Sequence, residues 1–232
     1  MDFKKYYQAN KTYLMYVDDR LGKIVRYCME AQPTTLLDIG CGEGTLLNEL
    51  SDKLPKTELY GTDVYSQNSK KWKYVVSDIT KRIEFDDNSF DVVVLGEVIE
   101  HVPDPDFVLA EISRILKRDG RLIVSTPNVA SWANRILVPL LGIQPLFTET
   151  STKQNVGRRL KVLGQGEKVQ GHLKVFTARS LKETIELNDF KVMSLSGSTF
   201  FFPSLLKYVD KAFSYVPSFA SNLVVVARNV KA

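Results

Sequence analysis

Two glutamates and the chain's two histidines are the side chains best suited to chemistry. Glu97, Glu100 and His101 fall within one helical turn or tight loop, so all three can point at one ligand. His172 is the only other histidine in the 232-residue chain. Two carboxylates and two imidazoles suit a divalent ion such as manganese, zinc or magnesium, and such an ion lowers the pKa of a nearby hydroxyl.

The same residues can act without a metal ion. An imidazole is a suitable general base near neutral pH, which makes His172 the candidate base, with His101 and Glu100 as further candidate catalytic groups. A third interpretation leaves His101 as a brace for its loop, hydrogen-bonded to a backbone carbonyl or to Glu97. The sequence leaves these hypotheses open.

Alternating strand and helix patterns must position these side chains. Short runs rich in Val, Ile and Leu predict five strands, at 35–39, 58–62, 74–77, 91–95 and 121–125. Helical patterns lie between them, including one that we expect to begin with Asp104 as N-cap and Pro105 in its first turn, and to end before Gly120. A helix at 177–188 and two β-like segments at 191–195 and 223–227 follow. This order is typical of an α/β fold with a mostly parallel sheet.

Three strand ends carry the signs of a nucleoside site. The first strand runs into a turn with Gly40, Gly42 and Gly44, where glycine lets the backbone approach a ligand closely. The second strand ends at Asp63, where a carboxylate can accept hydrogen bonds from both ribose hydroxyls, and Asp78 follows the third strand, where an adenine amine needs an acceptor. We therefore expect these three strand ends to meet at one nucleoside.

The glycine spacing argues against a dinucleotide dehydrogenase, which uses a similar turn and ribose acid. The chain has Thr45 where the dinucleotide fingerprint requires glycine or alanine. Only residues 64–71 are left for a helix between the second and third strands, which is shorter than usual for such a fold.

Residues 85–94, continued by Glu97-Val98-Ile99-Glu100-His101-Val102-Pro103-Asp104-Pro105, resemble the fourth strand and following loop of class I S-adenosylmethionine-dependent methyltransferases. The likeness extends over residues 36–228. It implies a Rossmann-like sheet of seven mostly parallel strands flanked by helices, with the last strand antiparallel. It also implies S-adenosylmethionine as cofactor and S-adenosylhomocysteine as product. The cofactor-binding residues that the resemblance implies are Asp38, Gly40, Cys41, Gly42, Asp63, Val64, Asp78, Ile79, Gly96 and Glu97.

The pattern Glu-x-x-Glu-His, followed much later by His172-x-x-x-x-Thr177, resembles two groups of methyltransferases. These are the metal-dependent RNA terminal 2′-O-methyltransferases and the quinone-type O-methyltransferases. In both, a divalent ion is held near the acceptor hydroxyl. The resemblance thus implies a metal site formed by Glu97, Glu100, His101 and His172.

The length of the chain favours one domain over 1–232. We expect a helical cap at 1–30, a cofactor-binding half at 31–126, a lid at 127–174 that contacts substrate, and a C-terminal helix with closing strands at 175–232. The lid is apolar in its first half and basic in its second, which suits an amphipathic or anionic acceptor, although the apolar part can equally pack on the core and the basic part can be a solvated loop. The apolar segment 200–206 is a candidate pocket wall or homodimer contact.

The function favoured by these patterns is O-methylation of a small-molecule, lipid-linked or sugar acceptor. The alternatives are a metal-dependent RNA 2′-O-methyltransferase and a cofactor-binding regulator without turnover. A net charge of +4 supports RNA binding poorly, and the retained acid–base groups argue against the regulator. The charged start of the chain, the two isolated cysteines and the absence of a long apolar run predict a cytoplasmic protein with reduced thiols and no transmembrane segment.

Overall fold

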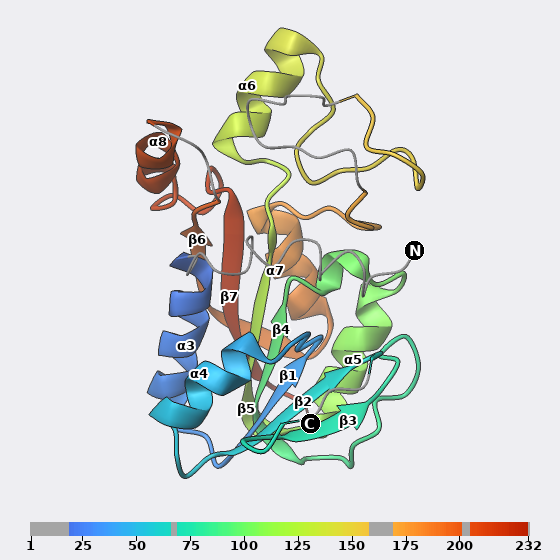
Figure 1. Ribbon diagram of the computed structural model, residues 1–232, viewed down its shortest axis with the longest axis vertical. Helices are drawn as coiled ribbons and strands as arrows, with labels where there is room; N and C mark the ends of the chain where they lie inside the picture. The colour runs from blue at the N-terminus through green and yellow to red at the C-terminus, as the bar shows by residue number, and fades with distance from the viewer. Residues whose placement is uncertain (1–18, 66–68, 158–168, 201–204, 232) are drawn as a thin grey trace.

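The computed structural model describes residues 19–65, 69–157, 169–200 and 205–231 (Figure 1). Seven strands in these ranges form one sheet in the order β3-β2-β1-β4-β5-β7-β6. They are β1 (Thr35–Ile39), β2 (Glu58–Asp63), β3 (Lys73–Val76), β4 (Phe90–Gly96), β5 (Leu116–Pro127), β6 (Phe190–Ser198) and β7 (Asn222–Asn229). Only β7 runs antiparallel to its neighbours β5 and β6. The predicted Rossmann-like sheet with an antiparallel last strand is confirmed.

Helices cover both faces of this sheet (Figure 1). α3 (Asp19–Ala31) and α4 (Thr45–Lys53) pack on one face, and α5 (Pro105–Ile115) and α7 (Ala178–Leu187) pack on the other. β4 is buried on both sides, since Val92 and Val94 belong to one apolar cluster and Val93 and Leu95 to the other. This alternation is why the strand is a continuous apolar run in the sequence.

The expected start of α5 is confirmed, but its expected end is wrong. The Asp104 side chain accepts a hydrogen bond from the Phe107 amide at 3.0 Å, and Pro105 begins the helix. The helix ends at Ile115, however, and Gly120 lies inside β5 rather than beyond a helix. A Cβ atom at Gly120 would lie 2.9 Å from the Lys117 carbonyl oxygen, so a close backbone approach, not a helix cap, accounts for this glycine.

Three other segments differ from the expectation or lie partly outside the described residues. Residues 64–65 and 69–72, between β2 and β3, form bends and no helix. The expected N-terminal cap is described only from α3 onward. Within the lid, a helix that we did not predict, α6 (Trp132–Leu141), follows β5, while residues 158–168, which hold much of the basic segment, lie outside the described ranges. Among the described helices, none combines the length and apolar content needed to cross a membrane.

A buried aspartate joins the lid to the C-terminal part of the chain. Asp210 on α8 (Leu206–Phe213) is fully buried, and one carboxylate oxygen accepts from Trp132 Nε1 at 2.7 Å and from Ser221 Oγ at 2.5 Å. Its other oxygen accepts from the Phe200 amide at 2.6 Å. The burial raises the pKa of this carboxyl group. The first turn of α6, the start of β7 and α8 are thus held by one side chain.

Asp210→Asn is expected to lower the free energy of unfolding by about 1–3 kcal/mol, because the new amide group turns one acceptor into a donor that faces a backbone N–H. Urea denaturation followed by tryptophan fluorescence measures the change. Asp86→Asn, at an exposed position, is the control and should leave the midpoint unchanged. Equal midpoints for Asp210→Asn and the unmodified protein would contradict this account of the network.

Candidate active site

The turn after β1 has the backbone shape that its glycines allow. Gly40 and Gly42 have φ values of 71° and 53°, in the left-handed region that favours glycine. A Cβ atom on Gly40 would lie 2.4 Å from a methyl group of Val98. The amides of Gly40 and Cys41 donate to the Thr62 carbonyl oxygen at 2.8 and 3.1 Å, which ties the turn to the end of β2.

Asp63 links the turn to the second strand end. Its carboxylate accepts from the Gly42 amide at 3.0 Å through one oxygen and from the Val64 amide at 2.7 Å through the other. Each carboxylate oxygen can accept a second hydrogen bond, so the side chain is oriented by the protein and still able to bind two hydroxyls. The structure brings the predicted glycines and the predicted ribose acid together.

The third strand end lies beside them. The Ser77 amide donates to the Asp63 carbonyl oxygen at 3.1 Å, which joins the end of β3 to that of β2. Asp78 is exposed, and its carboxylate accepts from the Thr80 hydroxyl at 2.6 Å; hydrogen bonds from Thr80 and the nearby Lys81 lower its pKa. Ile79 packs at the edge of the core.

Asp38 lies beneath the turn, almost wholly buried. Burial, together with the charge of Asp63, raises the pKa of Asp38 to about 8. Burial also raises the thiol pKa values of Cys28 and Cys41, so both remain protonated near neutral pH. Both cysteines are free and buried in the structure.

The raised pKa of Asp38 predicts a pH dependence of stability. In the folded, cofactor-free protein Asp38 keeps its proton up to about pH 8, whereas in the unfolded chain it loses the proton near pH 4. Unfolding therefore releases a proton between these values, and stability is expected to fall as pH rises from 5 to 8, by up to about 1.4 kcal/mol per pH unit. Urea titrations at several pH values measure this slope. Asp38→Asn should flatten it, and an equal slope in both proteins would rule out Asp38 as the source.

Two of the expected cofactor-binding residues, Gly96 and Glu97, lie at the end of β4. Glu97 follows Gly96 with a φ of 57°, unusual for a residue with a side chain. Its carboxylate accepts from Ser125 Oγ at 3.0 Å and pairs with Arg20 of α3 at 2.5 Å. Glu97 therefore lies with Ser125 and Arg20, and it is not part of the group of metal-ligating atoms described next, contrary to the four-residue site implied by the sequence.

Glu100, His101 and His172 come together at the short 3-10 helix η1 (Ile99–His101). One ligand atom from each of the three lies within 4.8 Å of the others. The two imidazole rings are 4.8 Å apart, edge to face, although 71 positions separate them in the chain. The predicted meeting of the two histidines near the end of β4 is present in the structure.

Backbone carbonyl groups set the orientation of both rings. His101 Nδ1 lies 3.1 Å from the Gly171 carbonyl oxygen, and His172 Nδ1 lies 2.8 Å from that of Phe147. A carbonyl can only accept, so Nδ1 carries the hydrogen in each neutral ring and the lone pair is on Nε2. Burial, with the nearby His172, lowers the pKa of His101, which favours the neutral form. The contact with a backbone carbonyl that was considered for His101 is present, and it uses Nδ1 rather than the ligand atom Nε2.

Glu100 presents an unpaired oxygen to this group. The side chain is buried, and Oε2 accepts from Thr126 Oγ1 at 3.0 Å. Oε1 is buried without a hydrogen-bond partner and lies 3.9 Å from His101 Nε2. Burial, with the charge of Glu97, raises the pKa of Glu100 well above its usual range. A buried carboxylate oxygen that lacks a donor is stabilised by a proton or a cation, so these three residues fit a divalent ion.

Comparison with known proteins decides the family. The family described as "Methyltransferase domain" matches residues 13–195, most of the chain. The chain belongs to the class I S-adenosylmethionine-dependent methyltransferases.

Two curated relatives of this methyltransferase chain have names that refer to quinones. It is 30% identical over 138 residues to the ubiquinone biosynthesis O-methyltransferase of Pelagibacter ubique, a match that covers 54% of this chain and 57% of the relative. It is 28% identical over 144 residues to the demethylmenaquinone methyltransferase of Thermotoga maritima, covering 57% and 62%. The chain therefore matches about three fifths of the length of these relatives.

A solved structure shares the fold. The 1,6-didemethyltoxoflavin-N1-methyltransferase of Burkholderia thailandensis, bound to 1,6-didemethyltoxoflavin and S-adenosylhomocysteine, has a TM-score of 0.61 at 15% identity. The alignment covers 99% of this chain and 86% of that one. At this identity the likeness concerns the fold alone.

Sequence reasoning missed the residues that join the lid of this methyltransferase to its site. The two carboxylate oxygens of Glu149 accept from the amides of Gln170 and Gly171, and the latter distance is 2.8 Å. The amides of Leu173 and Lys174 donate to the Glu100 carbonyl oxygen at 2.8 and 3.0 Å. No motif marks Glu149, because its partners are backbone groups about 20 positions away.

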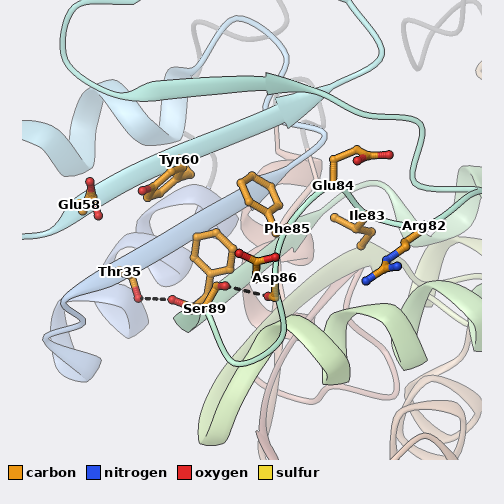
Figure 2. A pocket seen from close by; sticks show the side chains of 10 residues that line it. Thr35, Glu58, Tyr60, Arg82, Ile83, Glu84, Phe85, Asp86 and Ser89 are labelled. Carbon is orange, nitrogen blue, oxygen red and sulfur yellow. Dashed lines mark hydrogen bonds between the residues drawn. The ribbon is translucent and has the colours of Figure 1, made fainter.

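A separate cavity of about 550 Å³ lies at the opposite edge of the sheet (Figure 2). Tyr60, Phe85 and Phe90 form an aromatic wall, and Glu58 and Glu84 lie at the rim. Thr35, Glu58 and Phe90 each begin a strand, whereas the cofactor turn and the histidine pair follow strand ends. This cavity is therefore distinct from the candidate active site.

Proposed function

We propose that the protein transfers a methyl group from S-adenosylmethionine to a hydroxyl of a small-molecule, lipid-linked or sugar acceptor, with a ring hydroxyl of a quinol as the first candidate. The observation that carries this proposal is the convergence of Glu100, His101 and His172 next to the end of β4. The quinone-related names of the curated relatives support the choice of acceptor.

The cofactor part of the proposal rests on the strand ends. The turn at 38–44 and the Asp63 carboxylate hold the methionine portion and the ribose, and Asp78 and Ile79 flank the adenine. Gly96 and Glu97 then lie below the sulfonium. Methyl transfer from a sulfonium is an in-line displacement, so the main tasks of the protein are to align the acceptor oxygen with the methyl carbon and to receive the hydroxyl proton.

His172 is the proposed base. With the hydrogen on Nδ1 held by the Phe147 carbonyl, Nε2 can accept the hydroxyl proton as the oxygen forms its bond to the methyl carbon. The carbon–sulfur bond breaks, its electron pair stays on sulfur, and S-adenosylhomocysteine leaves as the neutral thioether. In the alternative with a metal, Nε2 of His172 would instead bind a divalent ion together with Glu100 and His101, and the ion would lower the pKa of the hydroxyl. Thr126 positions Glu100 in either case.

A panel of acceptors with methyl-labelled S-adenosylmethionine tests the proposal. It contains a catechol-type ring with an isoprenoid tail, the same ring without the tail, a free sugar and a short RNA with a 3′-terminal ribose. We expect label on a ring hydroxyl, and labelling about 10²- to 10⁴-fold slower when His172→Ala replaces the unmodified protein. Label only on the RNA 2′-hydroxyl would instead support the RNA alternative. Tight product binding without labelling of any acceptor would support the regulator and contradict the proposal.

A further inference from the structure

The second half of α6 is apolar and exposed on several sides. Leu140 is 74% exposed and Leu141 is 60% exposed, and Ile136 and Val138 are also exposed. A helix that is apolar all round is normally buried in a protein core or in lipid. This helix end therefore has the composition of a buried segment at an exposed position.

α8 and the turn after it add a second apolar surface. The exposed residues there, together with Leu205 just before the helix, are Leu206, Tyr208, Val209, Tyr215 and Val216. Tyr208 and Tyr215 are 64% and 76% exposed. Tyrosine is enriched where an apolar environment meets water, because its ring and its hydroxyl favour different sides.

The first residue of α6 packs against α8. The Trp132 ring stacks on Phe213 with centroids 5.7 Å apart, and Phe213 stacks on Phe219. The Arg135 guanidinium lies 4.5 Å from the Phe219 ring centroid and donates to the Ser218 carbonyl oxygen. Both helices lie at the same end of the molecule, the end toward which β5 runs (Figure 1). We call the exposed residues of α6, α8 and the following turn the α6–α8 surface.

The charge around this surface is positive. Residues 131–157 and 205–221 hold four bases, Arg135, Lys153, Lys207 and Lys211, and two acids, Glu149 and Asp210. Both carboxylates accept hydrogen bonds from within the protein. Glu149 accepts from backbone amides, and Asp210 is buried in its hydrogen-bond network. Lys211 pairs with Asp19 of α3 at 3.4 Å, which offsets one of these positive charges. An apolar surface with a basic border and exposed tyrosines is complementary to the headgroup region of an anionic bilayer.

We infer that the α6–α8 surface docks onto an anionic lipid bilayer. The apolar end of α6 enters the boundary between headgroups and acyl chains, and the lysines contact lipid phosphates. The protein lies on the membrane in this arrangement, since none of the described helices is able to span it. The docking does not depend on which acceptor is methylated, although it would bring the lid close to a lipid-linked acceptor.

Vesicle flotation with the full chain tests the docking. The vesicles are phosphatidylcholine alone, or phosphatidylcholine and phosphatidylglycerol in equal parts. We expect binding to the anionic vesicles that weakens with salt. Leu140→Ser with Leu141→Ser should weaken it more than about tenfold, and Lys153→Gln with Lys207→Gln should weaken it about fivefold for each charge removed.

Matched variants control for the loss of any exposed apolar residue. Leu187 on α7 and Met193 on β6 are 78% and 58% exposed and lie outside the α6–α8 surface. Leu187→Ser with Met193→Ser should leave vesicle binding unchanged. All variants should retain affinity for S-adenosylhomocysteine, which shows that they are folded.

Two outcomes would overturn the inference. One is equally weak binding of the unmodified protein and the Leu140→Ser, Leu141→Ser variant to anionic vesicles. The other is a concentration-dependent dimer in sedimentation velocity that this variant abolishes, with no binding to vesicles, because the surface would then be a contact between two copies of the chain.

Discussion

Replacing His172 by alanine is expected to lower the rate of methyl transfer by about 10²- to 10⁴-fold, the usual contribution of a positioned acid–base group. The affinity for S-adenosylhomocysteine should remain, because the Nδ1 hydrogen bond of His172 is to Phe147, whereas the hydrogen bonds to the Asp63 carboxylate come from the Gly42 and Val64 amides. Single-turnover assays with saturating acceptor measure the rate, and calorimetry measures the affinity.

The role of His172 as base or as metal ligand can be separated by titrating manganese, magnesium and zinc into the product-bound protein. If an ion binds with unit stoichiometry and both Glu100→Ala and His172→Ala abolish the binding, the three-residue metal site is supported. If no ion binds and only the rate depends on His172, the base is supported and the metal site is contradicted.

A carboxylate far from this site provides the control for the titration. Glu84 is exposed at the cavity on the opposite edge of the sheet. Glu84→Ala should leave both the rate and the ion binding unchanged. A rate that stays within threefold of the unmodified protein in His172→Ala would contradict both roles of His172.

The sequence was sufficient to predict the sheet and the cofactor turn because their determinants are local. Apolar runs mark buried strands. The glycine-rich turn follows the first strand and Asp63 ends the second, and the ends of neighbouring parallel strands lie close together. The hydrogen bond from the Gly42 amide to the Asp63 carboxylate shows that the two strand ends meet in the structure. The first five residues of β5 were not predicted as strand, because Leu116 continues the apolar spacing of α5 and the following Lys-Arg-Asp-Gly run is typical of a turn.

The arrangement around the histidines could be predicted only in part. The pairing of His101 with His172 was expected. Glu97 lies outside this group because its carboxylate contacts Arg20 from α3 and Ser125 from β5. The choice of ring nitrogen depends on carbonyl groups of Phe147 and Gly171 in the lid. Such contacts join segments far apart in the chain and follow no periodic pattern, so only coordinates reveal them.

Asp63→Ala is expected to weaken S-adenosylhomocysteine binding by about 10²- to 10⁴-fold, since it removes a charged acceptor from two ribose hydroxyls, at about 1.5–3 kcal/mol for each such hydrogen bond. The amides of Gly42 and Val64 also lose their acceptor, so the cofactor turn itself should become less ordered. Asp63→Asn keeps one acceptor oxygen and the size of the side chain, and should give an intermediate affinity. Asp52→Ala, at an exposed aspartate on α4, is the control. Calorimetric titration measures all four proteins, and an Asp63→Ala affinity within threefold of the unmodified protein would exclude Asp63 as the ribose-binding residue.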